Sequence, residues 1–156
     1  MALMNKELIK QWGESTAYSA KSHFKSADIK RLWIKGLVII NLLFAIISII
    51  EIGLPDLVKY CGIVSLIASV LLLVYESQED KNTLKRHMSI GDEYLKLHYE
   101  LQELFFSDQI DVAKAESIST RLKKMTNKDK PIIHQIGKWM AKRAIEKKGE
   151  MTTWWK

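Results

Sequence analysis

Two long apolar stretches near the N-terminus constrain this chain more than any other feature. The first covers residues 32–50 and the second residues 57–75, each about 19 residues long. At ~1.5 Å of rise per residue, a helix of that length covers roughly 28 Å, about the thickness of one bilayer hydrocarbon core. The alternative is a soluble protein with two buried helices, but so small a soluble domain cannot cover two helices that are apolar on every face. We therefore expect an all-α membrane protein built on a two-helix transmembrane hairpin.

The distribution of charge indicates how such a hairpin is oriented. The net charge is +6, and Lys and Arg residues gather before the first apolar stretch and after the second. The connector, residues 51–57, has neither, and Lys59 is the nearest basic residue. By the positive-inside rule both termini are expected in the cytoplasm and the connector outside. The first 30 or so residues are polar and no small-residue cleavage site follows, so we expect no cleaved signal peptide.

Three regions are expected along the chain. Residues 1–31 form an N-terminal cytosolic region, whose amphipathic helix over 5–31 runs directly into the first span, although Gly13 can break it. Residues 32–75 form the transmembrane hairpin with spans 32–50 and 57–75. Residues 76–156 form a C-terminal cytosolic region of extended helices. The single cysteine, Cys61, lies within the second span and cannot form a disulfide bond within the chain.

The second span is expected to continue as one long helix to residue 106, because no proline interrupts 76–106. This helix has two apolar stripes. One stripe would pair with the N-terminal helix: Leu84, Met88, Leu95, His98, Gln102 and Phe105. The other would be left over, and its members are candidate contacts of a homo-oligomer: Tyr94, Leu97, Leu101 and Leu104.

Beyond a break at residues 107–108, a short helix is expected over 112–125 and a last helix over 132–148. Asp129 would cap the last helix and Pro131 would lie in its first turn. The basic face of this helix can attract anionic lipid headgroups, or can simply be solvated. No nucleic acid is expected, since aromatic and basic residues do not interleave as they do in RNA-binding modules. The candidate membrane-surface contacts are Trp33, Tyr75, Lys138, Lys142, Trp154 and Trp155.

Polar side chains within the two spans stand out because they are costly in hydrocarbon. Asn41 and Ser48 share one face of the first span, and Cys61, Ser65 and Ser69 recur every four residues on the second. This spacing of small residues favours tight helix packing within the hairpin or between protomers. The alternative is that Asn41 lines water in an oligomeric pore. In both cases Asn41 is expected to face another helix or the oligomer axis and never lipid.

No pattern of catalytic residues is found. The seven glycines form no phosphate-binding loop, and the four histidines have no partner at metal-ligand spacing, so each is interpreted as a helix-surface or interface residue. We expect no enzyme, no metal site and no cofactor.

Two segments carry a resemblance to a known family. They are KRHMSIGDEYLKLHYELQELFF, which includes His87 and Gly91, and KPIIHQIGKWMAKRAI, which places Pro131 ahead of Trp139. With the preceding hairpin and cytosolic helix, they resemble the SLATT domain, a two-span effector associated with SMODS nucleotidyltransferases and SLOG sensors in bacterial defence. The resemblance implies a homo-oligomeric pore-former or membrane disruptor in the bacterial inner membrane, which acts in abortive infection when a partner or signal encoded nearby activates it. It implies no catalytic residue. The alternative function is a membrane anchor or scaffold whose cytosolic helices bind a partner protein.

Overall fold

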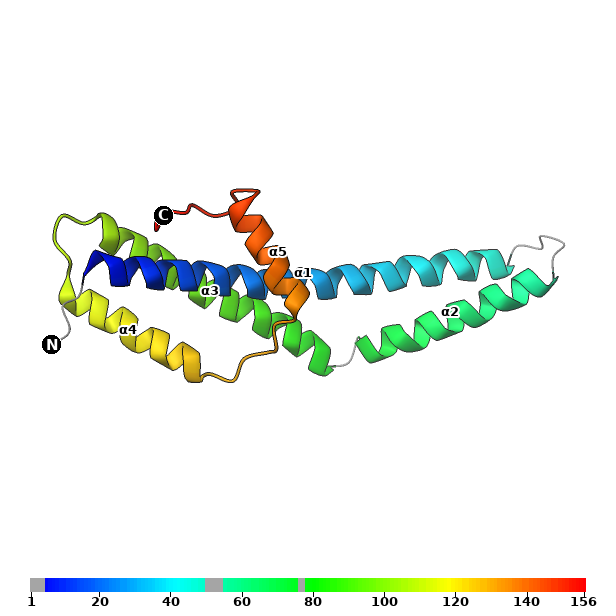
Figure 1. The fold of residues 1–156 in the computed structure, drawn as a ribbon. Coiled ribbons are helices and arrows are strands. Elements are labelled where there is room, and N and C mark those ends of the chain that lie inside the picture. Colours follow the sequence, from blue (N-terminus) through cyan, green and yellow to red (C-terminus); the bar gives the residue numbers. More distant parts are fainter. Residues whose placement is uncertain (1–4, 50–54, 76–77) are drawn as a thin grey trace. The chain divides into compact units, whose positions relative to one another are not determined.

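The computed structural model describes residues 5–49, 55–75 and 78–156, and these residues form helices and connecting segments without any strand. The prediction of an all-α fold is confirmed. The helices of the described residues are α1 (Lys6–Ile49), α2 (Pro55–Tyr75), α3 (Gln78–Phe106), α4 (Val112–Asn127) and α5 (Gln135–Glu146), as labelled in Figure 1. The predicted cap of the second span can be compared only in part, because most of the connector lies outside the described residues. Pro55 is the first residue of α2 and Asp56 lies in its first turn.

Helix α1 joins the predicted N-terminal helix and the first apolar stretch without a break. The side chain of Asn5 caps its start by accepting a hydrogen bond from the Leu8 amide at 2.9 Å. Gly13 does not interrupt it. The nearby Thr16 hydroxyl donates to the Trp12 carbonyl at 2.8 Å, which satisfies this polar group within the helix.

The chain divides into two compact units. One unit combines residues 1–27 with residues 85–156, and we call it the bundle. The other unit is residues 28–84, which we call the hairpin. The N-terminal and C-terminal regions that the sequence separated therefore belong to one unit. Whether α2 continues into α3, as predicted, depends on residues 76–77, which lie outside the described residues.

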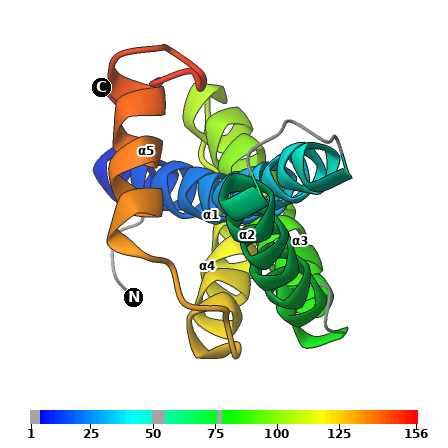
Figure 2. The same cartoon turned by 90° about the vertical axis from the view of Figure 1, so that its right-hand side faces the viewer.

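Within the bundle, α3, α4 and α5 lie around the N-terminal half of α1 (Figures 1 and 2). Its main core joins α1, α3 and α4 through Ile9, Ala20, Ile90, Tyr94, Leu97, Leu101, Leu104, Ala115, Ile118 and Met125. The stripe that was expected to be left over is therefore covered by the same chain. Leu97, Leu101 and Leu104 are no more than 2% exposed, and Tyr94 is 7% exposed. We correct their assignment as oligomer contacts, because α4 supplies the partner surface that this stripe needs.

The start of α5 differs from the prediction. Residues 129–134 are not helical, and α5 begins at Gln135 after His134. Arg86 Nη2 donates to the Asp129 carboxylate at 2.6 Å, so Asp129 binds α3 and does not cap a helix. A residue that precedes a proline is disfavoured in helical geometry, which agrees with the non-helical backbone before Pro131.

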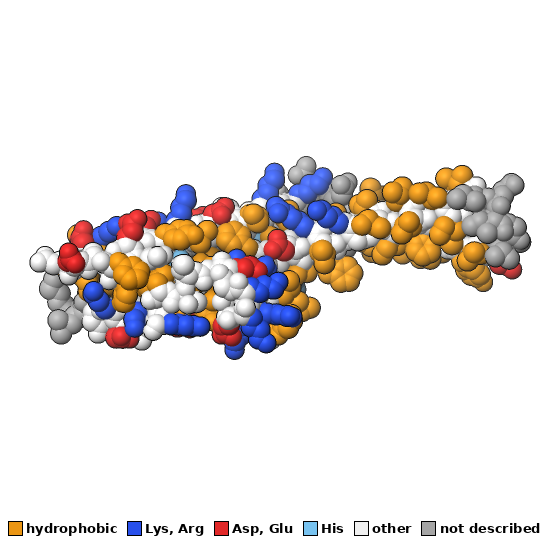
Figure 3. Space-filling view, turned by 90° about the horizontal axis from the view of Figure 1, so that it is seen from above, with side chains coloured by type: hydrophobic (Ala, Val, Ile, Leu, Met, Phe, Trp, Pro, Cys, Tyr) orange, Lys and Arg blue, Asp and Glu red, His pale blue; other side chains and the backbone are white. Residues whose placement is uncertain are grey.

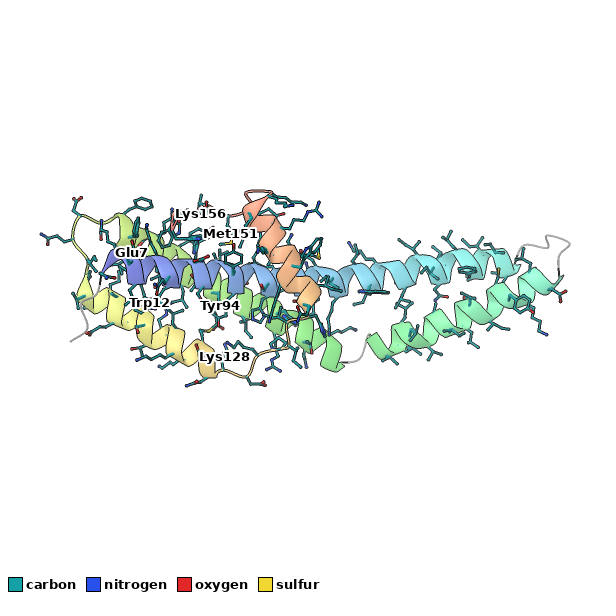
Figure 4. All side chains as sticks on the ribbon, in the orientation of Figure 1. Glu7, Trp12, Tyr94, Lys128, Met151 and Lys156 are labelled. Carbon is teal, nitrogen blue, oxygen red and sulfur yellow. The ribbon has the colours of Figure 1, made fainter. Side chains whose placement is uncertain are left out.

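The segment after α5 runs back along the bundle, and Figure 4 labels Met151 and Lys156 on it. Trp155 is 6% exposed and packs with Ala17 and Ile145. Trp154 packs so closely against Gly13 that a side chain at that position would clash with its ring. We therefore correct the assignment of Trp154 and Trp155 as membrane-surface contacts. They belong to the interior of the bundle, where their large apolar area is buried.

Candidate functional site

A polar seam joins the two helices of the hairpin, and it consists of Asn41, Ser65 and Ser69. Asn41 Nδ2 donates to Ser69 Oγ at 2.9 Å, and Ser65 Oγ donates to Asn41 Oδ1 at 2.6 Å. The carboxamide therefore uses both its donor and its acceptor side against α2. An amide left without partners away from water would cost several kcal/mol, so these bonds favour the observed facing of the two helices.

Small residues extend the contact on both sides of the polar seam. Cys61 and Ala68 are each 4% exposed. The Ser48 hydroxyl donates to the Phe44 carbonyl of its own helix at 2.7 Å. A Cβ on Gly62 would lie 3.7 Å from Ser48 Oγ, at ordinary contact distance. The small-residue face of α2 therefore packs against α1, whereas water-lining by Asn41 stays a prediction.

The outward surface of the hairpin is apolar. The most exposed of its large apolar side chains include Leu32, Ile49, Leu66 and Leu73, each at least 67% exposed. Hydrophobic side chains cover most of the surface that these helices present in Figure 3. Both α1 and residues Asp56–Val74 of α2 are long and apolar enough to cross a membrane. Trp33, a predicted membrane-surface residue, is 63% exposed, and the side chain of Tyr75 lies outside the described part.

The bundle buries histidines that the sequence had placed on surfaces or interfaces. His23 on α1 and His87 on α3 are 1% and 3% exposed, and their Nδ1 atoms are 2.9 Å apart. One Nδ1 must donate and the other accept, so at least one of the two rings is neutral. Tyr94 stacks on His23, and Lys130 Nζ donates to the Tyr94 hydroxyl at 3.0 Å. We call His23 and His87 the histidine pair.

Burial, with smaller contributions from the neighbouring His87 and Lys130, lowers the pKa of His23 to about 4. The physical cause is that a charged imidazole loses its hydration in the core and meets positive neighbours there. The His23 ring is consequently neutral near pH 7. The two members of the histidine pair lie 64 positions apart in the sequence, so no local spacing could have indicated their contact.

His98 is a third buried histidine, with both ring nitrogens occupied. Its Nδ1 donates to the Gly13 carbonyl at 3.0 Å, and its Nε2 accepts from Trp154 Nε1 at 3.1 Å. Burial lowers the pKa of His98, and the bond to Gly13 partly opposes this. A groove of about 770 Å³ passes beside His98. Since both nitrogens are engaged, this imidazole presents no base to a molecule in the groove.

In the part of the chain that the structure describes, no three side chains of His, Cys, Asp or Glu gather as metal ligands would. The two predicted lipid-facing lysines, Lys138 and Lys142, are exposed on α5. The structure thus brings together Asn41, Ser65 and Ser69. Of the predicted surface contacts, Trp33, Lys138 and Lys142 are exposed, whereas Trp154 is half-buried and Trp155 is buried in the bundle.

Comparison of the chain with protein-family models, curated proteins and solved structures finds no match.

Proposed function

We propose that this chain is a membrane effector whose hairpin crosses the bacterial inner membrane twice and assembles into oligomers that permeabilise it. The polar seam is the single observation that carries this proposal. An anchor can be built from apolar and small residues alone, whereas an amide at mid-span adds a desolvation cost. The polar groups of Asn41, Ser65 and Ser69 hydrogen-bond one another inside the hairpin and could instead bind water if the two helices separated.

In this proposal the closed hairpin is the resting form. Its outward side chains are apolar and suit lipid, while the polar groups satisfy one another. In an assembled form the two helices would turn so that the polar seam faces a water-filled path, where water replaces the lost hydrogen bonds. Polar lining lowers the barrier to wetting a narrow pore, and an apolar lining raises it.

The orientation of the effector is supported by the asymmetry of charge. Basic residues flank the hairpin on its two sequence ends, and the connector over 51–57 has none. Both termini, and with them the bundle, are therefore proposed to lie in the cytoplasm. A cytoplasmic bundle is available to an activating protein or to a signal produced in the cell. The resemblance to SLATT effectors supports a role in abortive infection, with the activating partner encoded nearby.

A second candidate function is a membrane anchor or scaffold whose bundle binds a partner protein. The observation that favours it is the completeness of the polar seam. Both sides of the Asn41 carboxamide are satisfied within one hairpin, so the spans need neither water nor a second protomer for hydrogen bonding. An anchor of this kind would leave the membrane sealed.

Dye release separates the two functions. The full chain is reconstituted into liposomes of bacterial lipid over a range of protein-to-lipid ratios, with an unrelated two-span anchor at equal mole fraction as control. An oligomeric effector releases dye with a dependence on protein density steeper than linear. Sealed liposomes at every ratio, with the spans inserted, would refute permeabilisation and favour the anchor.

A further inference from the structure

Three large apolar side chains are exposed on the bundle within eight residues of the chain, one just before α5 and two on it. Ile132, Ile136 and Trp139 are 79%, 62% and 59% exposed. They follow one another at spacings of four and three residues, so Ile136 and Trp139 share one side of the helix. We call these three residues, with Lys138, Lys142 and Arg143, the α5 face. Neighbouring exposed apolar side chains such as Ile136 and Trp139, rimmed by charged residues, are typical of a surface that binds a partner.

The opposite side of α5 is fixed against the bundle. Gly137, Ala141, Ala144 and Ile145 are buried. A Cβ on Gly137 would lie only 2.5 Å from Ser26 Oγ, so the backbone of α5 approaches α1 as closely as it can. The helix cannot roll to bury Trp139 without losing this contact. The exposure of the α5 face is thus a consequence of how α5 packs.

The charge of the α5 face is positive and is not offset on the helix itself. Lys138, Lys142 and Arg143 are exposed, and Arg143 Cζ lies 5.6 Å from the centre of the Trp139 ring. The one acidic residue of α5, Glu146, accepts a hydrogen bond from the Tyr18 hydroxyl at 2.9 Å and so faces α1.

The next acidic residue along the chain is also directed inward. Glu150 pairs with Lys21 at 2.9 Å and with Lys25 at 3.2 Å. The carboxylates of this part of the bundle therefore bind α1, and the cations of the α5 face are left to attract an external anion.

This combination of groups fits an anionic lipid surface better than a second copy of the chain. Tryptophan and isoleucine enter the boundary between headgroups and acyl chains, while lysine and arginine reach the phosphates. Two copies of the α5 face would repel each other by their cations. Three apolar side chains are also far fewer than the 20–30 residues a side of a stable protein interface.

The position of α5 in the bundle agrees with a lipid partner. Ser26, which contacts Gly137, precedes the first residue of the apolar stretch, Leu32, by six positions in the sequence. The α5 helix thus packs on the part of the bundle's α1 segment that is nearest in sequence to the proposed membrane crossing. We propose that the α5 face docks on the anionic headgroup surface of the membrane into which the hairpin is inserted, a proposal that rests on that insertion.

Spin labels on the full chain in lipid nanodiscs test this docking. In a Cys61→Ala background, single labels are placed through Ile136→Cys on the α5 face, Leu66→Cys on the hairpin and Ser117→Cys on the exposed side of α4. The accessibility of each label to oxygen, which concentrates in lipid, and to a water-soluble nickel complex is compared in phosphatidylglycerol and phosphatidylcholine nanodiscs. Docking predicts that the label at residue 136 moves from nickel-accessible in phosphatidylcholine to oxygen-accessible in phosphatidylglycerol, while the label at residue 117 stays nickel-accessible in both.

The hairpin label keeps the two proposals apart. If the label at residue 66 is lipid-protected and the label at residue 136 stays in water in both lipids, docking is overturned and membrane insertion stands. If the label at residue 66 is itself in water, insertion fails and docking fails with it. Equal protection of residue 136 from both reagents in both lipids means that protein covers the α5 face, which also overturns docking.

Neutralising the basic residues tests the role of charge. Each basic residue near an anionic surface contributes roughly a fivefold preference, so Lys138→Gln with Lys142→Gln should lower the ratio of docked to undocked label roughly thirtyfold. The matched control is Lys123→Gln with Lys124→Gln on α4, which removes the same charge from exposed positions elsewhere. An equal loss in both variants would show general attraction of a basic protein and would overturn docking through the α5 face.

Discussion

Asn41 is the residue whose chemistry bears most directly on the proposed function. Its amide contacts Ser65 and Ser69 across the hairpin, and these hydroxyls have an alternative in the carbonyls one turn earlier on their own helix. Removing the amide therefore need not leave either serine without a hydrogen bond. Interhelical hydrogen bonds in membranes contribute roughly 0.6–2 kcal/mol, so the hairpin should tolerate the loss.

We predict that Asn41→Leu leaves insertion intact and reduces both dye release and toxicity in cells, because an apolar side chain raises the wetting barrier of the proposed path. Dye release from liposomes and growth after induction measure the effect. The control is Ser48→Ala, which removes a hydroxyl bound only within its own helix. A variant that assembles and leaks like the parent would exclude Asn41 from conduction.

The histidine pair predicts that the bundle loses stability in mild acid. The pKa of His23 is about 4 in the fold and ~6.5 in the unfolded chain, so between these values the unfolded state binds more protons. Stability is then full above about pH 7, falls as the pH drops through 6.5, and has lost roughly 3 kcal/mol by pH 4. His98 contributes in the same direction, since burial lowers its pKa also.

Thermal unfolding of the detergent-solubilised chain, followed by tryptophan emission at pH 7.5, 6.0 and 5.0, measures this loss. Trp12, Trp154 and Trp155 pack in the bundle and report its unfolding. We expect His23→Gln to flatten the pH dependence. His134→Gln, at an exposed histidine, should leave the dependence as in the parent. Parallel pH profiles for the parent and His23→Gln would contradict the assignment.

At the scale of elements, α3 is the helix whose role changes most between sequence and structure. Leu97 is 1% exposed in a core shared with α1 and α4, so a carboxylate there would be buried without a partner. We predict that Leu97→Glu destabilises the bundle by about 3–5 kcal/mol and does not act on assembly alone. Circular dichroism during heating, together with light scattering, distinguishes the two effects.

The matched control for this prediction is Ser89→Glu, which adds the same charge at an exposed position of α3. It should unfold like the parent. A Leu97→Glu variant that keeps the parental unfolding temperature but forms smaller particles would contradict this prediction and support the original assignment of Leu97 as an oligomer contact.

Periodicity and chain-breaking residues predict most of the helices. The two apolar runs correspond to the second part of α1 and to α2, the polar segment that ends at residue 106 corresponds to α3, and the break at residues 107–108 follows α3. The predicted continuity of the second span with this segment lies on residues 76–77, outside the described residues. The start of α5 was missed because Arg86 holds Asp129 from 43 positions away, a contact that local patterns do not contain.

The candidate site was predicted as a set of residues but not as a geometry. Asn41, Ser65 and Ser69 are conspicuous in apolar spans, yet which of them meet depends on the rotation of one helix against the other. The partner of the apolar stripe that begins at Tyr94 on α3 could not be predicted either, because α4 is short and its sequence does not reveal which surface it will cover. Trp154 and Trp155 fit a membrane surface as well as a core by composition alone.

At the scale of the whole molecule, orientation across the membrane is the property most open to test. We predict that a reporter active only in the cytoplasm works when fused after residue 156, and that alkaline phosphatase is active when inserted within residues 51–56. The physical reason is that segments rich in Lys and Arg, which here flank the hairpin, stay on the cytoplasmic side of the membrane, whereas the connector has no basic residue and can cross. Cysteine accessibility at the same two positions, probed with an impermeant reagent, serves as control for any disturbance by the fusions. A cytoplasmic connector would contradict both the orientation and the proposed pore.

The bundle is assembled from two pieces of chain, residues 1–27 and 85–156, with the hairpin between them. If the hairpin is inserted, these pieces can meet only when the chain crosses the membrane an even number of times. A single crossing would strand Ile9 and Leu97, which share one core, on opposite sides of the bilayer. The bundle can therefore form only after the chain has crossed the membrane twice. A molecule that fails to complete its second crossing keeps an exposed, incomplete core that cellular proteases can recognise.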